Sequence, residues 1–106
     1  MDAQTGEGLI PNSAPYFGGG GGYAWGNALC TVARQLYAWT GDMAVARQGY
    51  KAIGKWLDYY ESKRDANYII RSNSHTWMLG DWLAPDTVIS NVYYISTVCY
   101  LQAVKT

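Results

Sequence analysis

Apolar residues recur at helical spacing in three stretches of the chain, separated by long polar or glycine-rich stretches. The first helix is predicted from about Gly26 to Trp39, because its apolar residues are spaced three, four and three apart. These residues are Leu29, Val32, Leu36 and Trp39. Arg34 is the only charge in this stretch, so the helix is expected to contact protein on most sides.

Two further helices follow. Gly41 is predicted to end the first helix, and Asp42 to cap a second that runs from about Met43 to Ser62. The second helix is amphipathic, with charges on one side and an apolar stripe made of Ala46, Tyr50, Ile53, Leu57 and Tyr60. The third is predicted to begin after Pro85, with Asp86 as its cap. Residues 68–70 are a candidate short strand.

The order of these helices indicates the fold class. A helix with almost no charge is followed by an amphipathic one and then by a second with almost no charge. This alternation is typical of an α/α toroid, in which inner helices pack on both sides and outer helices show one face to water. We therefore expect an all-α fold, a partial (α/α)6 barrel. The long loops before the first and third helices would emerge at the same end.

Five consecutive glycines, residues 18–22, lead into Tyr-Ala-Trp-Gly-Asn at residues 23–27. Glycine has no side chain and loses much backbone entropy when ordered, so a flexible linker explains the run by itself. The large rings directly behind it favour a second interpretation, in which the backbone closely approaches the rim of a pocket and Trp25 forms a wall. The run alone does not choose between them.

Composition excludes several classes of function. The formal net charge of the 106 residues is zero, which does not indicate binding to nucleic acid or to an anionic membrane. No apolar run reaches the roughly 18 residues that cross a bilayer, and the acidic, polar stretch 1–7 is not a signal peptide. Cys30 and Cys99 have no metal-site spacing and are predicted to be buried free thiols. His75, the only histidine, lies in a polar stretch without ligand partners, so no metal is expected.

Ten tyrosines and five tryptophans against one phenylalanine are the unusual feature of the composition. These side chains suit a carbohydrate-stacking cleft, and they equally suit a large helical core.

Several motifs together resemble the catalytic domain of bacterial α-L-rhamnosidases, glycoside hydrolase family 78. They are Pro-Asn-Ser-Ala-Pro at 11–15, Ala-Trp-Gly-Asn-Ala at 24–28, Leu-Tyr at 36–37, Thr-Gly-Asp at 40–42, Trp-Leu-Asp-Tyr at 56–59, Gly-Asp-Trp-Leu-Ala-Pro at 80–85 and Tyr-Tyr at 93–94. They cover nearly the whole chain in order. Ala-Trp-Gly-x-Ala and Gly-Asp-Trp-x-Ala-Pro are fairly specific as a pair.

The resemblance implies a cofactor-free (α/α)6 enzyme that removes terminal α-L-rhamnose from glycosides with inversion. Inversion requires a general acid and a general base, and the family carries them upstream and downstream of these motifs. Residues 1–106 would then be a central fragment of the catalytic domain, inactive alone, without a catalytic residue of its own and dependent on the rest of that domain.

Four residues are candidates for binding the sugar. By resemblance, Trp25 and Trp82 would contact rhamnose, and Asp81 would accept from a hydroxyl or orient a neighbour. Asn27 stands where the family usually has Asp, and its amide cannot act as a base or carry the charge.

Two other functions remain open. Another α/α-toroid glycosidase would use the same aromatic residues on a different sugar, and a non-catalytic helical module would bind carbohydrate or a partner. A monomeric, cooperatively folding 106-residue chain with affinity for sugar would favour the module.

Overall fold

A computed structural model describes residues 3–15, 22–71, 85–87 and 90–106 of the chain. Within these ranges the regular elements are all helices, which confirms the predicted all-α class. They are α1 (Gly22–Gly26), α2 (Ala28–Thr40), α3 (Ala44–Glu61) and α4 (Val92–Val104).

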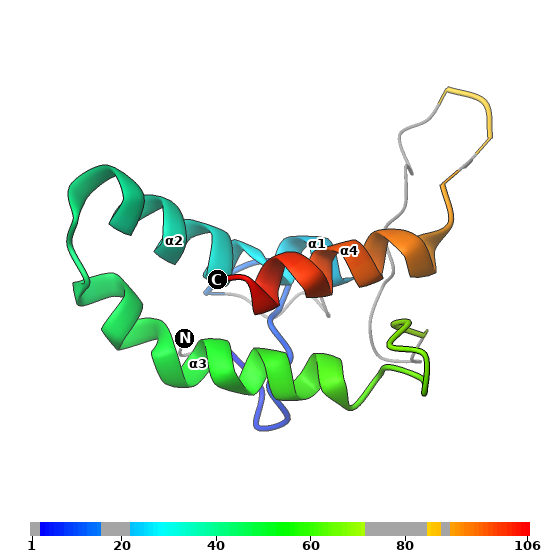
Figure 1. Ribbon diagram of the computed structural model, residues 1–106, viewed down its shortest axis with the longest axis horizontal. Coiled ribbons are helices and arrows are strands. Elements are labelled where there is room, and N and C mark those ends of the chain that lie inside the picture. The colour runs from blue at the N-terminus through cyan, green and yellow to red at the C-terminus, as the bar shows by residue number, and fades with distance from the viewer. Residues whose placement is uncertain (1–2, 16–21, 72–84, 88–89) are drawn as a thin grey trace.

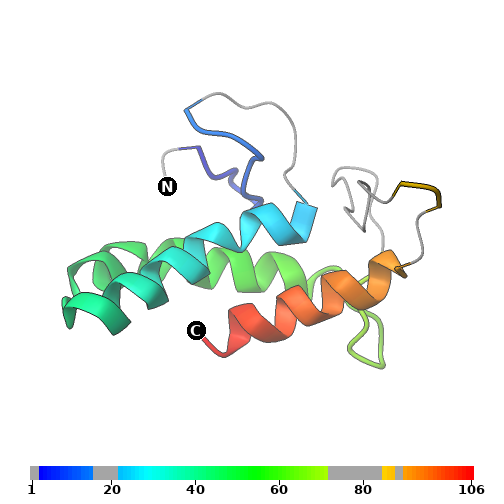
Figure 2. The ribbon, with the colours of Figure 1, turned by 90° about the horizontal axis from the view of Figure 1, so that it is seen from above.

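The helices form an antiparallel pair with a third helix beside it. α1 and α2 follow one another with Asn27 between them, and α3 returns in the opposite direction (Figure 1). α4 runs in the same direction as α2 and packs on α1 and α3 (Figure 2). The N-terminal ends of α1 and α4 therefore lie at the same end of the molecule.

The turn between α2 and α3 is formed as predicted. Gly41 adopts a left-handed conformation with φ of 68°, and its N–H donates to the Tyr37 carbonyl at 2.8 Å. Glycine adopts this conformation without the steric cost of a Cβ. The predicted cap Asp42 lies one residue before the N-cap position of α3, which Met43 occupies without a side-chain bond, but the Asp42 carboxylate still accepts the N–H of Ala44 at 2.7 Å.

The start of the last helix differs from the prediction. α4 begins at Val92, and the Asn91 side chain caps it by accepting the N–H groups of Tyr93 at 2.9 Å and Tyr94 at 3.3 Å. Asp86 is therefore not the cap. The β-branched run at 87–89 has low helix propensity, and Asn caps a helix as well as Asp does.

Residues 68–70 do not form the predicted strand. A single antiparallel bridge between Arg64 and Ile70 closes a tight loop after α3. Inside this loop the Asp65 carboxylate accepts the N–H of Asn67 at 2.8 Å and that of Ile69 at 3.0 Å. Asp is well suited to such local turns, and here it replaces the ladder that the apolar run predicted.

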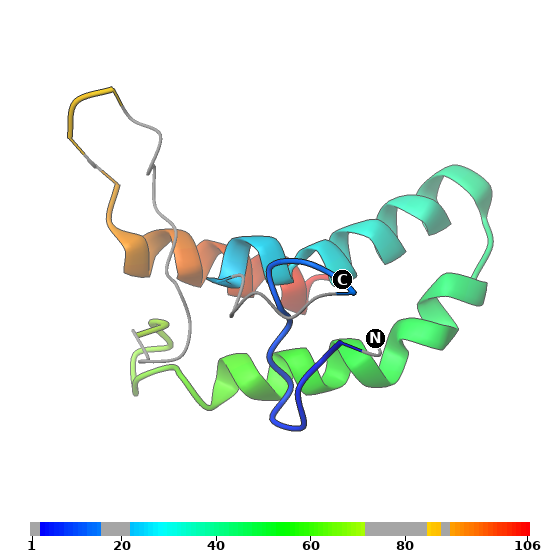
Figure 3. The same ribbon diagram turned by 180° about the vertical axis from the view of Figure 1, so that it is seen from behind.

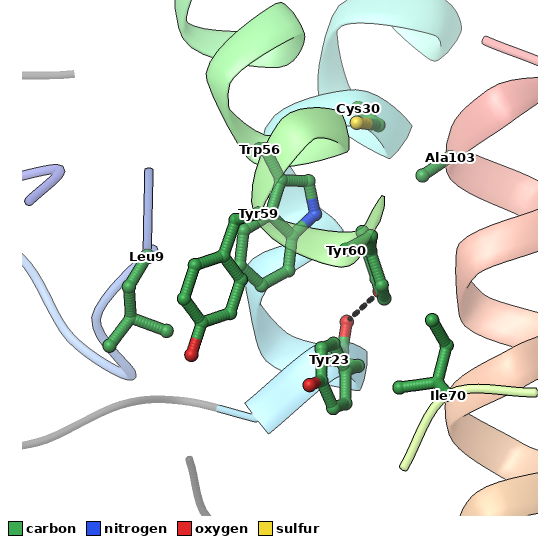
Figure 4. Close-up of a cluster of buried hydrophobic side chains, with 8 residues drawn as sticks. All are labelled: Leu9, Tyr23, Cys30, Trp56, Tyr59, Tyr60, Ile70 and Ala103. Carbon is green, nitrogen blue, oxygen red and sulfur yellow. Dashed lines mark hydrogen bonds between the residues drawn. The ribbon is translucent and has the colours of Figure 1, made fainter. Parts of the chain in front are cut away.

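The core is a cluster of aromatic side chains from α1 and α3 (Figure 4). Trp56 and Tyr60 are completely buried. The Tyr23 ring stacks on Tyr60 with centroids 4.7 Å apart, and Trp56 meets Tyr60 edge-on at the same separation. The cluster is completed by Leu9, Cys30, Tyr59, Ile70 and Ala103.

The N-terminal segment packs against α3 (Figure 3). The Gln4 side chain donates to the Gly8 carbonyl at 2.9 Å and to the Ala52 carbonyl at 3.0 Å. Gly8 has φ of 100°, and a Cβ there would overlap the Lys55 carbonyl. The glycine thus lets residues 3–15 reach α3 and place Leu9 in the core.

Large parts of the apolar helix faces are exposed in the described chain. α2 buries only Cys30 and Ala33, whereas Val32 and Trp39 of its predicted stripe are exposed, Trp39 by 81%. α3 buries a second face, containing Trp56, in place of much of the predicted one. Tyr50, on the predicted stripe, is 78% exposed.

Gly26 is expected to be essential for the packing of α1 against Trp56 of α3, because an added Cβ would overlap the Trp56 ring. Gly26→Ala should lower the free energy of unfolding by about 1–3 kcal/mol through overpacking. Gly54→Ala is the matched control, since a Cβ there meets nothing within 4 Å. It should raise the free energy by about 0.5–1 kcal/mol through helix propensity. Unfolding of the complete gene product that contains these residues measures both, and equal effects would contradict the packing argument.

Candidate functional site

The candidate site is built on the short helix α1, which presents one large aromatic side chain to the outside. Trp25 is 50% exposed, while its neighbours Tyr23 and Gly26 on the same helix are buried. The buried Tyr23 ring stacks on Tyr60 of α3, so α1 is fixed to the core on one side. The exposed indole therefore projects from a firmly held turn of helix.

Asn27, between α1 and α2, has a side chain surrounded by protein. It is 5% exposed. Its Oδ1 accepts the Trp56 indole N–H at 3.0 Å and the Tyr60 hydroxyl at 2.9 Å. Its Nδ2 donates to the Cys99 carbonyl at 2.6 Å. One carboxamide thus joins the α1–α2 junction to both α3 and α4.

The chemistry of these partners determines which way the amide points. An indole N–H only donates, and a backbone carbonyl only accepts. Oδ1 must therefore face Trp56 and Nδ2 must face Cys99. The single Tyr60 proton lies between two acceptors, Asn27 Oδ1 and the Tyr23 carbonyl at 3.0 Å.

The described titratable groups in the core around the amide are uncharged at neutral pH. Burial raises the pKa of the Cys30 thiol to about 11, and it also raises the pKa of Cys99. Burial, followed by the neighbouring Cys99, Tyr23 and Cys30, moves the pKa of Tyr60 far above its ordinary range. These groups hold their protons at neutral pH, so the cluster offers no general base.

Two carboxylates of the described chain are paired with arginine side chains. Glu61 is paired with Arg64 and accepts the Tyr100 hydroxyl, at the surface. Asp65 is paired with Arg71 at 2.8 Å, also at the surface. Across the described ranges, no group of three or more His, Cys, Asp or Glu side chains is placed to hold a metal ion. No described helix is long and apolar enough to span a bilayer.

The structure places two of the four predicted site residues. Trp25 is exposed, and Asn27, two residues further along the chain, is buried. Asp81 and Trp82 lie outside the described residues. His75 lies outside them as well. The predicted sugar contacts of all four candidates stay predictions.

Sequence reasoning missed the partners that fix this region. Trp56 and Tyr60 form the network with Asn27, and Trp56 was not assigned to the apolar stripe of its helix. A signal was present: Gly49, Ala52, Trp56 and Tyr59 recur at spacings of three, four and three and define a second face. Small residues on that face allow close approach by another segment.

The described residues thus form an all-α hairpin with a buried aromatic core and an exposed indole at one end. The model for the bacterial alpha-L-rhamnosidase six-hairpin glycosidase domain matches residues 1–106. The chain belongs to this family.

A curated relative gives the same assignment. The chain is 28% identical over 86 residues to an alpha-L-rhamnosidase from Alteromonas sp. (strain LOR). The match covers 79% of this chain and 9% of the relative, so the chain spans about a tenth of that protein's length. No solved structure matches the chain.

The Cys30 thiol is expected to react slowly in the folded protein. With its pKa raised from 9.0 to about 11, the thiolate fraction at pH 8 falls about a hundredfold. Burial of the side chain slows the reaction further. Alkylation by iodoacetamide at pH 8, followed by mass spectrometry, should label Cys30 at least a hundredfold more slowly in native than in denatured protein. Equal rates would show that Cys30 is not in the core.

Proposed function

We propose that these residues are a central part of the catalytic domain of an inverting α-L-rhamnosidase and that they supply sugar-binding aromatics. Membership in the six-hairpin glycosidase family carries this proposal. The half-exposed indole of Trp25, on a helix otherwise fixed in the core, supports it. The substrate class is a glycoside with a terminal α-L-rhamnose, and the reaction requires no cofactor.

Trp25 is proposed to form an apolar wall of the sugar site. Rhamnose has a methyl group and C–H faces, and these suit the flat surface of an indole. Trp82 is proposed to form a second wall, and Asp81 to accept from a sugar hydroxyl. Asn27 has both ends of its amide bonded inside the chain, so its part in the site is proposed to be indirect.

The acid and base of the reaction are proposed to lie outside residues 1–106. An inverting glycosidase places two carboxyl groups about 6.5–9.5 Å apart, so that a water molecule fits between the sugar and the base. The carboxylates of Glu61 and Asp65 form surface ion pairs with Arg64 and Arg71. We assign no described carboxylate to catalysis.

The exposed apolar side chains support the proposal that further helical hairpins cover this chain. Trp39 and Tyr50 are about four-fifths exposed, and Val32 and Leu101 are half exposed. Large apolar side chains exposed in such number favour an interface. In an (α/α)6 barrel the neighbouring hairpins would bury it.

The activity is tested by comparing two proteins. The complete gene product should hydrolyse an aryl α-L-rhamnoside and release β-L-rhamnose first, as proton NMR of the anomeric signal would record. The 106-residue chain alone should give no turnover above the uncatalysed rate, because it lacks the acid and the base. Turnover by the short chain would overturn this placement of the catalytic carboxylates, and release of the α-anomer would overturn inversion. Preference for another aryl glycoside would favour a different toroid glycosidase.

Trp25 is tested by kinetics in the complete gene product. Trp25→Ala should lower kcat/KM for the aryl rhamnoside about 10- to 100-fold, since burial of an aromatic face contributes roughly 1.5–3 kcal/mol. Trp25→Phe keeps a flat ring and should lose much less. Trp39→Ala is the control: it removes an indole from the far end of α2 that neighbouring hairpins are proposed to cover, so it should lower stability but leave KM unchanged. An unchanged kcat/KM for Trp25→Ala would exclude a sugar contact.

A further inference from the structure

The amide of Asn27 is the only described side chain that bonds to both α3 and α4 from the junction of α1 and α2. Two residues before it in the chain, the Trp25 indole is exposed. The Asn27 amide itself bonds to three groups of the other helices: the Trp56 indole, the Tyr60 hydroxyl and the Cys99 carbonyl. A change in this amide would therefore move α1 relative to α3 and α4.

We propose that Asn27 is a positioning residue, whose neutral carboxamide fastens α1 to α3 and α4 and so sets the direction of the Trp25 indole. The role of that indole in binding sugar rests on the function proposed above. The positioning itself is a property of the fold and has its own readout.

The network requires a group that accepts on one side and donates on the other. A carboxylate at position 27 would accept from Trp56 and Tyr60, but it would place a negative oxygen against the Cys99 carbonyl, which now accepts from Nδ2 at 2.6 Å. A protonated carboxyl group restores the donor. An aspartate at this position would thus hold α1 only while it is protonated.

Among the described residues, no charged side chain hydrogen-bonds the amide or belongs to the core cluster that contains its partners. The titratable groups of this cluster and of the side chains packed against it are phenols and thiols, which are neutral at pH 7. They are Tyr23 from α1, Cys30 from α2, Tyr59 and Tyr60 from α3, and Cys99 and Tyr100 from α4. Two charged groups face these phenols from outside: the Lys63 ammonium lies 5.1 Å from the Tyr59 ring centroid, and Glu61, paired with Arg64 at the surface, accepts the Tyr100 hydroxyl.

The test is Asn27→Asp in the complete gene product. Burial among neutral groups and the opposing carbonyl raise the pKa of the new carboxyl above its unfolded value of about 3.9. The stability that the protonated form provides is therefore present at low pH and lost as pH rises through the folded pKa. The melting temperature should fall between about pH 5 and pH 8, while the parent shows no such step.

The direction of Trp25 is read without any substrate. The contribution of Trp25 to the fluorescence is obtained by subtracting the emission spectrum of the same protein carrying Trp25→Phe. In Asn27→Asp this difference spectrum should shift and become more accessible to acrylamide as pH rises, with no change in the parent. In the same range KM for the aryl rhamnoside should rise about tenfold or more while kcat changes less.

Two control variants complete the experiment. Asn27→Leu keeps the size of the side chain and cannot titrate, so its Trp25 signal should be altered equally at every pH. Trp56→Phe keeps one core ring but removes the N–H that Oδ1 accepts, together with the rest of the smaller indole ring, so its Trp25 signal should also differ from that of the parent. If Asn27→Asp does not fold, the Trp25 signal of Trp56→Phe tests the proposal instead.

The outcomes separate the two proposals. A pH step in the Trp25 signal of Asn27→Asp supports the positioning role, even in a protein that hydrolyses no rhamnoside, and only the proposed function then fails. A Trp25 signal that is the same in the parent, Asn27→Asp and Trp56→Phe at all pH values overturns the positioning role. If Trp25→Ala still raises KM in that case, the proposed function stands.

Discussion

The burial of one indole is the constraint on which the rest of this structure depends. Trp56 is completely enclosed, and its N–H must find an acceptor because an unpaired buried donor costs about 1–3 kcal/mol. The acceptor is Asn27, and the neighbouring residue must be glycine because the Trp56 ring occupies the space of a Cβ. The Gly26–Asn27 pair at the junction of α1 and α2 is thus set by a residue of α3.

The same constraint gives the core its polar but uncharged character. Tyr60 hydrogen-bonds both Asn27 and the Tyr23 carbonyl, and its ring packs on those of Tyr23 and Trp56. Each polar atom in this group is satisfied by another neutral atom. Such a network favours one arrangement of the helices, since any shift leaves a buried donor or acceptor without a partner. Because α1 is bonded into this network, the network also holds the backbone that carries the exposed Trp25.

Periodicity predicted the helices well and their buried faces less well. The first two helices were placed within about two residues, because Gly41 and Asp42 act locally and their effect does not depend on packing. The faces depend on partners. α2 carries apolar residues around most of its circumference, so spacing alone did not distinguish Cys30 and Ala33, which are buried, from Val32 and Trp39, which are not.

The candidate site was predictable only in part for the same reason. The sequence singled out Trp25 from its position after the glycines, and its indole is half exposed, but its role as a wall of a pocket stays a prediction. It did not indicate that Asn27 would be buried, because the three contacts of its amide come from residues 29, 33 and 72 positions away. Long-range partners of a polar side chain leave no local pattern.

Two of the exposed aromatic regions in the described part of the chain are suited to different tasks. A groove of about 450 Å³ between α2, α3 and the end of α4 is lined mainly by apolar side chains, among them Tyr37, Tyr50 and Leu57. A sugar brings hydroxyl groups that need several polar partners, and this lining offers few, so the groove suits packing against another helix. Trp25 lies at the other end of the α1–α2 pair, beside a network of fully bonded polar groups. These bonded groups offer a sugar no free polar partner, so the proposal of a sugar site at α1 rests on the exposed aromatic face alone.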